Sequence, residues 1–190
     1  MAGRPKDPTV NQKIYAEIER LLVDYNLNQI TIDQIAENTG VSKATIYRRW
    51  PDKSFIIMDL FLERAETFHP AYLNLYDDLY RFLVTMMNIY KTPIGTAVIE
   101  ILVSHHDTDA KARFMEEYFL KKRAILKSII EPHIHSEDED MLIDLIFSPI
   151  YFNILIKPDV LNESYIETIL TKVLQVYDLS LIHISEPTRP

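Results

Sequence analysis

The sequence predicts an all-α protein, and three observations support this prediction. The 190 residues include only 3 glycines, and the Asn-Gly and Asp-Gly pairs that close tight β-hairpins are absent. Apolar residues recur at spacings of three and four along most of the chain, which is the pattern of amphipathic helices. Capping residues and prolines punctuate these segments where helices typically begin and end. We therefore expect about nine helices joined by short connections.

The first helix is expected to run from Thr9 to about Tyr25. Thr9 is placed to cap this helix, with Gln12 as its capping-box partner three residues ahead. The inward stripe consists of apolar residues at helical spacing, namely Ile14, Ile18, Leu21 and Leu22.

Residues 31–53, TIDQIAENTGVSKATIYRRWPDK, predict two short helices joined by a tight turn. Thr31 is placed to cap the first helix, and Gln34 completes a capping box. Gly40 supplies the left-handed stop that residues with a β-carbon resist. Ser42 is then placed to cap the second helix.

The second of these helices is expected over residues 43–49, with Pro51 closing it and Ile46 pointing back into the core. This layout is typical of a helix-turn-helix motif, whose second helix enters a DNA groove. An ordinary helical hairpin with a solvated charged face is the alternative. Turn glycine, serine cap, buried isoleucine and basic side chains agree with one another, and this agreement favours the DNA-binding motif.

Two further helices follow from similar signals. Asp52 is placed to cap a helix toward Phe68, with an inward stripe of Phe55, Met58, Leu62 and Ala65. An aromatic-rich helix is then expected from about Leu73 to Tyr90.

Start and stop signals define four helices in the rest of the chain. Thr92 as cap and Pro93 as first residue open a helix that ends near Val103. A longer helix should run from about Asp109 to Ile130 and stop before Pro132. Ser136 and Glu139 form a capping box before a helix from about Glu137 to Ile156, in which Pro149 should bend the axis. Asn162 caps the last helix, which should reach about Tyr177.

The run ITIDQIAENTGVSKATIYRRWPDKSFI resembles the DNA-binding signature of bacterial TetR-type transcriptional repressors. In that signature, a helix-turn-helix leads through an aromatic and proline step into a long fourth helix. The resemblance covers roughly residues 10–62, and beyond them it extends to the general helical plan. SPIYFNILI at residues 148–156 also looks like the dimer-helix segment of some of these regulators. The resemblance implies a three-helix DNA-binding domain at 1–51 and a helical effector-binding and dimerisation domain at 52–178.

The side chains around the second helix can be assigned roles on DNA. Base edges are expected to meet Lys43, Thr45 and Arg48, of which Arg48 could also serve a phosphate. Phosphates are expected to meet hydroxyl groups and one further lysine, namely Thr31, Ser42, Tyr47 and Lys53. The N-terminal arm with Arg4 and Lys6 could enter a minor groove. Trp50 is expected to pack between the DNA-binding unit and the following helix.

The net charge of −8 is unevenly divided along the chain. Residues 1–55 carry 8 Lys and Arg against 7 Asp and Glu, whereas residues 56–190 carry 12 against 21. An acidic remainder can repel DNA from the wrong face, although acidic residues also simply aid solubility.

The chain has no cysteine, which excludes disulfides and thiolate metal sites. No apolar run approaches the roughly 18 residues of a membrane helix and the N-terminus lacks a signal-peptide core, so we expect a cytoplasmic protein.

The last two helices carry more apolar surface than one packing contact requires, which predicts a two-fold four-helix interface between two copies of the chain. The expected interface residues are Leu142, Leu145, Ile146, Pro149, Ile150, Ile166, Ile169, Leu170 and Val173. The alternative is that both helices are core helices of one chain. Aromatic and methionine side chains could line an effector cavity, although such stripes more often form plain core. These residues are Phe82, Met86, Tyr90, Phe114, Tyr118, Phe147 and Tyr151.

No motif for catalysis or for a cofactor is present. A long predicted helix separates His105, His106 and Asp107 from His133 and His135, so these groups are expected to be solvated and no metal site is predicted.

The predicted function is therefore a homodimeric, non-enzymatic repressor, released from a palindromic double-stranded DNA operator by an unidentified small-molecule effector. The alternative is a helical protein-interaction module without sequence-specific DNA binding, and a metal-dependent enzyme ranks far below it.

Residues 179–190, LSLIHISEPTRP, resemble the in-frame translation of a sequencing-library adapter. We expect this segment to be a non-native tail and exclude it from the fold prediction. The native sequence would then differ from this chain from about Asp178.

Overall fold

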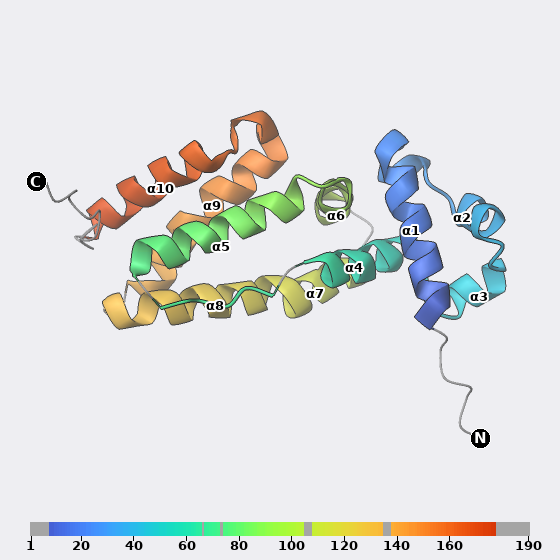
Figure 1. Ribbon diagram of the computed structural model, residues 1–190, viewed down its shortest axis with the longest axis horizontal. Helices are drawn as coiled ribbons and strands as arrows, with labels where there is room; N and C mark the ends of the chain where they lie inside the picture. The colour runs from blue at the N-terminus through green and yellow to red at the C-terminus, as the bar shows by residue number, and fades with distance from the viewer. Residues whose placement is uncertain (1–7, 66, 73, 105–107, 135–137, 178–190) are drawn as a thin grey trace, which may run out of the picture. The chain divides into compact units, whose positions relative to one another are not determined.

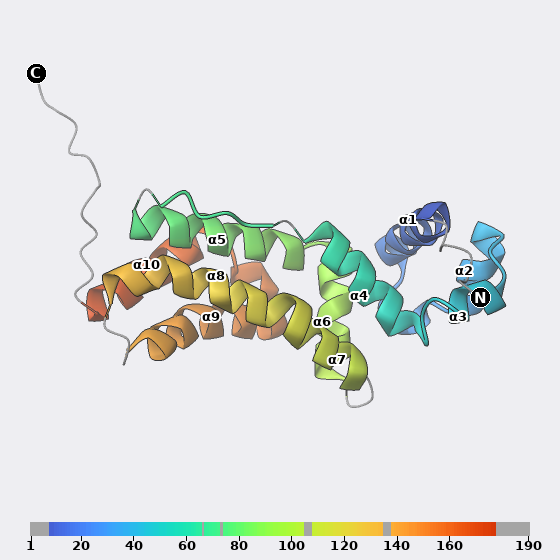
Figure 2. The same cartoon turned by 90° about the horizontal axis from the view of Figure 1, so that it is seen from below.

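The computed structural model describes residues 8–177, apart from 66, 73, 105–107 and 135–137. The described residues form helices and connections without a strand, which confirms the all-α prediction (Figures 1 and 2). The α-helices are α1 (Pro8–Asp24), α2 (Ile32–Thr39), α3 (Lys43–Tyr47), α4 (Lys53–Arg64), α5 (Leu75–Tyr90), α6 (Pro93–Val103), α7 (Thr108–Phe114), α8 (Leu120–Ile130), α9 (Glu139–Ile156) and α10 (Glu163–Val176). Short 3₁₀ turns are η1 (Leu27–Gln29), η3 (Glu131–His133) and η4 (Pro158–Val160), and η2 (Met115–Phe119) is a π-helical segment.

Five predicted caps are confirmed. In each case a side-chain oxygen accepts a backbone N–H two or three residues ahead, which satisfies one of the donors that a helix start leaves open. The capping residues are Thr31, Ser42, Asp52, Thr92 and Asn162. Local sequence chemistry therefore sets the start of half of the α-helices in the described part of the chain.

Several predicted boundaries differ from the structure. Helix α3 ends at Tyr47 and not at residue 49. Helix α1 begins at Pro8, so Thr9 lies inside the helix and is not its cap. Helix α4 ends at Arg64, because the chain becomes extended at Ala65 and Phe68 then packs edge-on against Phe82 with ring centroids 5.2 Å apart. Helix α9 begins at Glu139, and the capping residue predicted for it, Ser136, lies outside the described residues.

The long helix predicted over 109–130 is continuous from α7 through η2 to α8, but it contains a π-helical turn. A π-helical turn is wider than an α-helical one and shifts the side chains that follow it around the helix axis. Here the segment contains Tyr118, which is buried. The predicted stripe of α4 was also partly wrong, because Met58 is buried while Phe55, Leu62 and Ala65 are only half-buried.

The chain forms two compact units, which are described separately. The first comprises the described residues of 1–65 and 92–117, and the second those of 66–91 and 118–190. These compact units do not test the predicted boundary between the two functional domains at residues 51 and 52, which stays a prediction.

In the first unit, α1 packs against α2, α4 and α6, and α4 also packs against α6 and α7. Fully buried isoleucines form its core, and they are Ile14, Ile18, Ile35, Ile46, Ile56 and Ile57. The helix-turn-helix is therefore built on the same core as helices from later in the chain.

In the second unit, α5 packs against α8 and α10, and α9 packs against α8 and α10. Aromatic rings from α5, η2 and α9 fill its centre, with the Phe82 and Phe147 centroids 6.1 Å apart and the Phe147 and Tyr151 centroids 5.6 Å apart. None of the described helices in either unit has the length and apolar composition needed to cross a membrane.

Candidate nucleic-acid interface

The turn between α2 and α3 has the conformation that the sequence predicts. Gly40 adopts φ 66°, and a β-carbon built there would meet no atom within 4 Å, so the backbone conformation alone requires glycine. Thr39 tightens the turn, because its hydroxyl donates to the Ile35 carbonyl at 2.6 Å and accepts the Val41 N–H at 3.2 Å. Ile46 is fully buried, which fixes the rotation of α3 about its axis. The other side of α3 must then face outward.

The outward side of α3 carries the side chains predicted to meet DNA. Lys43 and Arg48 are exposed, Tyr47 is 52% exposed, and Thr45 is half-buried. The Thr45 hydroxyl lies 2.9 Å from the Ser42 hydroxyl at the N-terminus of α3. Thr31 is exposed as the cap of α2, where its hydroxyl accepts the Gln34 N–H at 3.2 Å. The structure therefore brings six of the predicted contact residues, those from Thr31 to Arg48, onto one short segment.

Lys43 pairs with Asp33 of α2 at 2.7 Å, and both side chains are well exposed. Exposed ion pairs contribute little to stability, because water and salt screen them. The pair thus holds Lys43 near α2 in the free protein while leaving its ammonium available to a stronger acceptor.

Lys53, at the first position of α4, is directed into the protein. Its Nζ donates to the Leu27 and Ile30 carbonyls, each at 2.8 Å, and lies 3.5 Å from the Asn28 carbonyl. These bonds do not test the predicted phosphate contact of Lys53. They show that the Lys53 ammonium is directed at η1 in the free protein. Sequence reasoning missed this role because no local pattern relates a lysine at a helix start to a turn more than 20 residues earlier.

The C-terminal end of the helix-turn-helix is attached to α1 and α4. Arg49 donates from Nη1 to Asn11 Oδ1 at 2.6 Å. Trp50 is buried, donates from Nε1 to Asp59 of α4, and lies 6.0 Å from the Tyr15 ring. The expected packing role of Trp50 is therefore confirmed.

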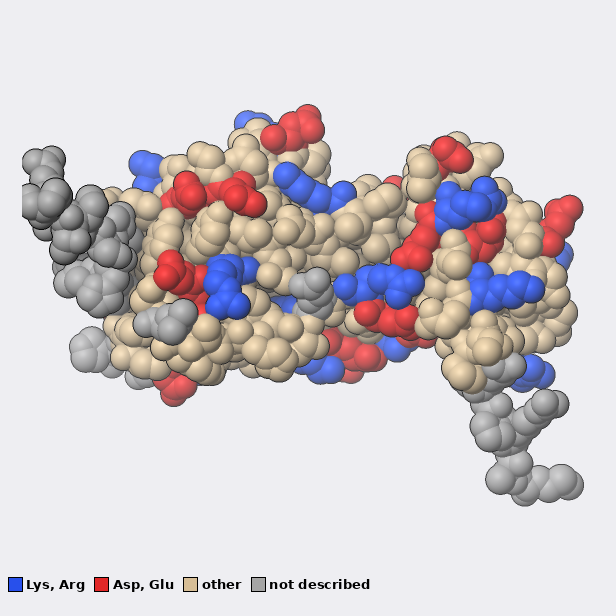
Figure 3. Space-filling view, viewed as in Figure 1, with Lys and Arg blue, Asp and Glu red and all other residues tan. Residues whose placement is uncertain are grey.

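Charge on the described surface is mixed. Figure 3 shows Lys and Arg beside Asp and Glu over the face that it presents, without a broad patch of one sign. The predicted DNA arm, Arg4 and Lys6, lies outside the described residues. Phosphate contact depends on local positive charge, and the cations around α3 can supply such charge without a broad basic patch.

The residues predicted to line an effector cavity are divided between the two units, and their shared cavity stays a prediction. Phe114 lies in the first unit, where its ring is 6.2 Å from that of Phe61. The other six lie in the second unit, where Phe82, Met86, Tyr90, Tyr118 and Phe147 are buried and Tyr151 is half-buried.

Three tyrosines form the polar part of this aromatic centre. The rings of Tyr118 and Tyr151 each lie about 6 Å from that of Tyr90, at 6.1 and 5.8 Å. Burial raises the pKa of all three hydroxyls, and that of Tyr151 rises to about 12. These groups stay protonated at neutral pH and can donate hydrogen bonds within an otherwise apolar region.

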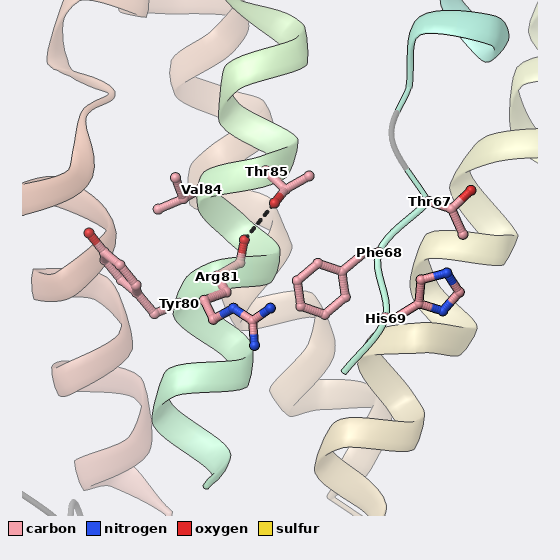
Figure 4. A pocket seen from close by; sticks show the side chains of 7 residues that line it. All are labelled: Thr67, Phe68, His69, Tyr80, Arg81, Val84 and Thr85. Atoms are coloured by element: carbon pink, nitrogen blue, oxygen red, sulfur yellow. Dashed lines mark hydrogen bonds between the residues drawn. The ribbon is translucent and has the colours of Figure 1, made fainter. Parts of the chain in front are cut away.

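A pocket of about 420 Å³ lies elsewhere in the second unit (Figure 4). It is lined by Thr67, Phe68, His69, Tyr80, Arg81, Val84 and Thr85, none of which the sequence predicted. Phe68 and Arg81 face each other, with the guanidinium 5.7 Å from the ring, whereas Tyr80 and Val84 project from the other side of α5. The side chains diverge, so this is a surface groove. The sequence does not indicate this groove, because the helix that ends at Arg64 was predicted to continue toward Phe68.

The predicted dimer residues fall into two groups. Leu142, Ile146, Ile150, Ile166 and Leu170 are fully buried within one chain, so their assignment to an interface was wrong. Their helix faces fill the core of the second unit, because α9 and α10 pack against each other and against α8 and α5. Leu145 is 40% exposed, and Pro149, Ile169 and Val173 are half-buried.

Helix α9 has a second apolar face, which we call the α9 stripe. Its members recur at spacings of three and four and are Met141, Leu145, Pro149, Phe152 and Ile156. Four of the five are large apolar side chains that are 40–60% exposed. Contiguous apolar surface of this kind typically marks an interaction site.

The described residues contain no cluster of His, Asp and Glu that could hold a metal ion, and His105, His106, Asp107 and His135 lie outside the described part.

Comparison with known proteins places the chain in a family. The sequence model described as bacterial regulatory proteins, tetR family, matches residues 14–57. The chain is similar to the uncharacterized HTH-type transcriptional regulator YdeS of Bacillus subtilis, with 30% identity over 173 residues that cover 86% of this chain and 87% of that protein. It is also 37% identical over 87 residues to the uncharacterized HTH-type transcriptional regulator Mb1581 of Mycobacterium bovis, which covers 43% of each chain. The fold is similar to that of a TetR transcriptional regulator from Rhodococcus sp. RHA1, with a TM-score of 0.63 at 15% identity over 90% of this chain and 99% of that one. The chain therefore belongs to the tetR family of bacterial regulatory proteins.

Proposed function

We propose that this DNA-binding regulator acts as a homodimeric repressor in the cytoplasm, and that a small lipophilic ligand releases it from a palindromic operator. The observation that carries the proposal is the segment after Gly40, in which buried Ile46 turns Lys43 and Tyr47 outward. A short helix with an anchored inner side and a polar outer side fits the major groove of DNA.

Base and phosphate contacts are assigned by side-chain chemistry. Lys43 and Arg48 can donate to guanine acceptors, and the Thr45 methyl can meet a thymine methyl. Thr31, Ser42 and Tyr47 carry hydroxyls suited to phosphate oxygens.

The α9 stripe is proposed as the centre of the homodimer interface. A helix that exposes large apolar side chains at the spacing of one face can pack against its own copy across a two-fold axis. One recognition helix covers only a short half-site, and two copies about 34 to 36 Å apart, or at a multiple of that distance, would read a palindrome.

The effector is proposed to bind in the aromatic centre of the second unit. A lipophilic molecule with a hydrogen-bond acceptor suits this centre, because Tyr90, Tyr118 and Tyr151 supply hydroxyl donors among buried rings. Such a ligand changes the affinity for DNA only if it binds one conformer of the protein better than another.

A gel-shift titration on DNA from upstream of the protein's own gene tests the function. We expect a discrete complex that persists over excess scrambled DNA and dissociates when the right lipophilic compound is added. Equal affinity for the upstream and scrambled duplexes would favour the protein-interaction alternative and reject the operator.

A further inference from the structure

The turn η1, which connects α1 to α2, is held by a side chain from α4. Lys53 Nζ donates to the carbonyls of Leu27 and Ile30, the residues at either end of this turn, at 2.8 Å each. A cation between two carbonyls fixes their separation, because charge-assisted hydrogen bonds are stronger than neutral ones.

A second side chain, from α6, holds the same turn. The Glu100 carboxyl lies beside the Leu27 N–H, and its Oε2 is buried and has no hydrogen-bond partner among the described atoms. Burial raises the pKa of Glu100, and the Leu27 N–H and the nearby Lys53 cation oppose this rise. A buried carboxylate oxygen without a partner is uncommon in folded proteins and calls for an explanation.

The turn itself is rigid and leads directly into the DNA-binding motif. Asn26 and Gln29 exchange two hydrogen bonds, from the Gln29 N–H to Asn26 Oδ1 at 3.3 Å and from the Asn26 N–H to Gln29 Oε1 at 3.0 Å. Ile30 is buried and immediately precedes Thr31, the cap of α2. A displacement of η1 would therefore be passed to the start of α2.

We infer that Lys53 and Glu100 are positioning residues for DNA binding, which set the helix-turn-helix by clamping η1 from α4 and α6 without touching DNA. This inference rests on the proposed DNA binding. It also supplies a route by which a ligand that moves α6 changes the affinity for the operator, because the Glu100 carboxyl of α6 lies beside the first residue of the turn.

The competing role for Lys53 is the phosphate contact predicted from the sequence, and salt dependence separates the two. Loss of one phosphate contact lowers the slope of log K against log salt by about 0.9, whereas loss of a positioning residue weakens binding with the slope unchanged. We would measure operator affinity over a range of salt for Lys53→Met, Glu100→Leu and the double variant. Lys121→Met, which removes an exposed lysine on α8, serves as the matched control.

The clamp predicts that each single variant weakens operator binding roughly 10-fold, as expected when charge-assisted hydrogen bonds are lost, while Lys121→Met does not. Because both residues act through η1, the double variant should lose less than the product of the two effects. A slope reduced by about 0.9 in Lys53→Met, or wild-type affinity in Glu100→Leu, would overturn the inference. Should Lys53→Met fail to fold, Glu100→Leu alone decides, since a phosphate role for Lys53 predicts no effect there.

Amide hydrogen exchange separates failure of the clamp from failure of the proposed function. Glu100→Leu removes the carboxyl that lies beside the Leu27 N–H, so the exchange of this amide should become faster than in the wild type while the unfolding midpoint is retained. If the wild type binds no DNA but the Leu27 amide exchanges faster in Glu100→Leu than in the wild type, the proposed function is wrong and the clamp is supported. Unchanged exchange at Leu27 would refute the clamp itself.

Discussion

Replacing Phe152 by Glu should break the proposed homodimer. Phe152 is 55% exposed on the α9 stripe. An aromatic side chain can bury roughly 200 Å², so roughly 100 Å² of this ring is available to a partner. At roughly 25 cal/mol per Å², that area is worth roughly 2.5 kcal/mol per copy and roughly 5 kcal/mol for the two symmetric copies.

Association entropy and imperfect packing reduce what such an area yields, so we expect the dimer dissociation constant to rise by roughly 100-fold or more. The new carboxylate would also lose hydration at the interface, which acts in the same direction. Sedimentation equilibrium over a range of protein concentrations measures the change. Val23→Glu is the matched control, because Val23 is 72% exposed but lies on α1.

The predicted result is a monomer for Phe152→Glu and a dimer for both the wild type and Val23→Glu. Affinity for a palindromic duplex should fall in Phe152→Glu to that for a half-site, because the two recognition helices are no longer joined. If Phe152→Glu retains the wild-type dissociation constant, the α9 stripe is not the interface.

The remaining predictions concern DNA reading, stability and pH. Lys43→Ala should relax sequence preference by roughly 1–3 kcal/mol at one base pair, measured as the difference between cognate and single-mismatch duplexes, and equal losses on all duplexes would reject base contact. Ile46→Ala should lower the free energy of unfolding by roughly 2–5 kcal/mol in urea titrations, because the side chain is fully buried and a cavity would remain, and a loss under roughly 1 kcal/mol would show that the site collapses. Because burial raises the pKa of Tyr151 to about 12 from 10.0, the folded state keeps a proton that the unfolded state releases, and stability should fall as pH rises through that interval. In Tyr151→Phe, the urea midpoint of unfolding should fall less steeply with pH across this interval than in the wild type. An identical fall in both proteins would contradict the raised pKa of Tyr151.

The sequence was sufficient wherever structure follows from neighbouring residues. Thr31, Ser42 and Asp52 are caps because their oxygens reach backbone N–H groups two or three residues ahead, and this requires nothing distant. Gly40 was predictable for the same reason, since the left-handed conformation is local.

Features that depend on distant packing were not predictable. Helix α9 is apolar on more than one side, so periodicity could not decide which face enters the core, and Leu142 was assigned to the wrong one. Helix α4 was predicted too long because the contact of Phe68 with Phe82 competes with helix continuation. The bonds from Lys53 to η1 likewise join segments that the sequence separates by more than 20 residues.

A dimer that reads two half-sites fixes both the number and the spacing of chains on an operator. Once a gel shift has identified an operator, the mass of the complex and hydroxyl-radical footprinting of the same DNA would give both quantities. We expect two chains per duplex and two protected half-sites whose centres are about 34 to 36 Å apart, or a multiple of that distance. One chain per duplex, or uniform protection that disappears with modest salt, would contradict it.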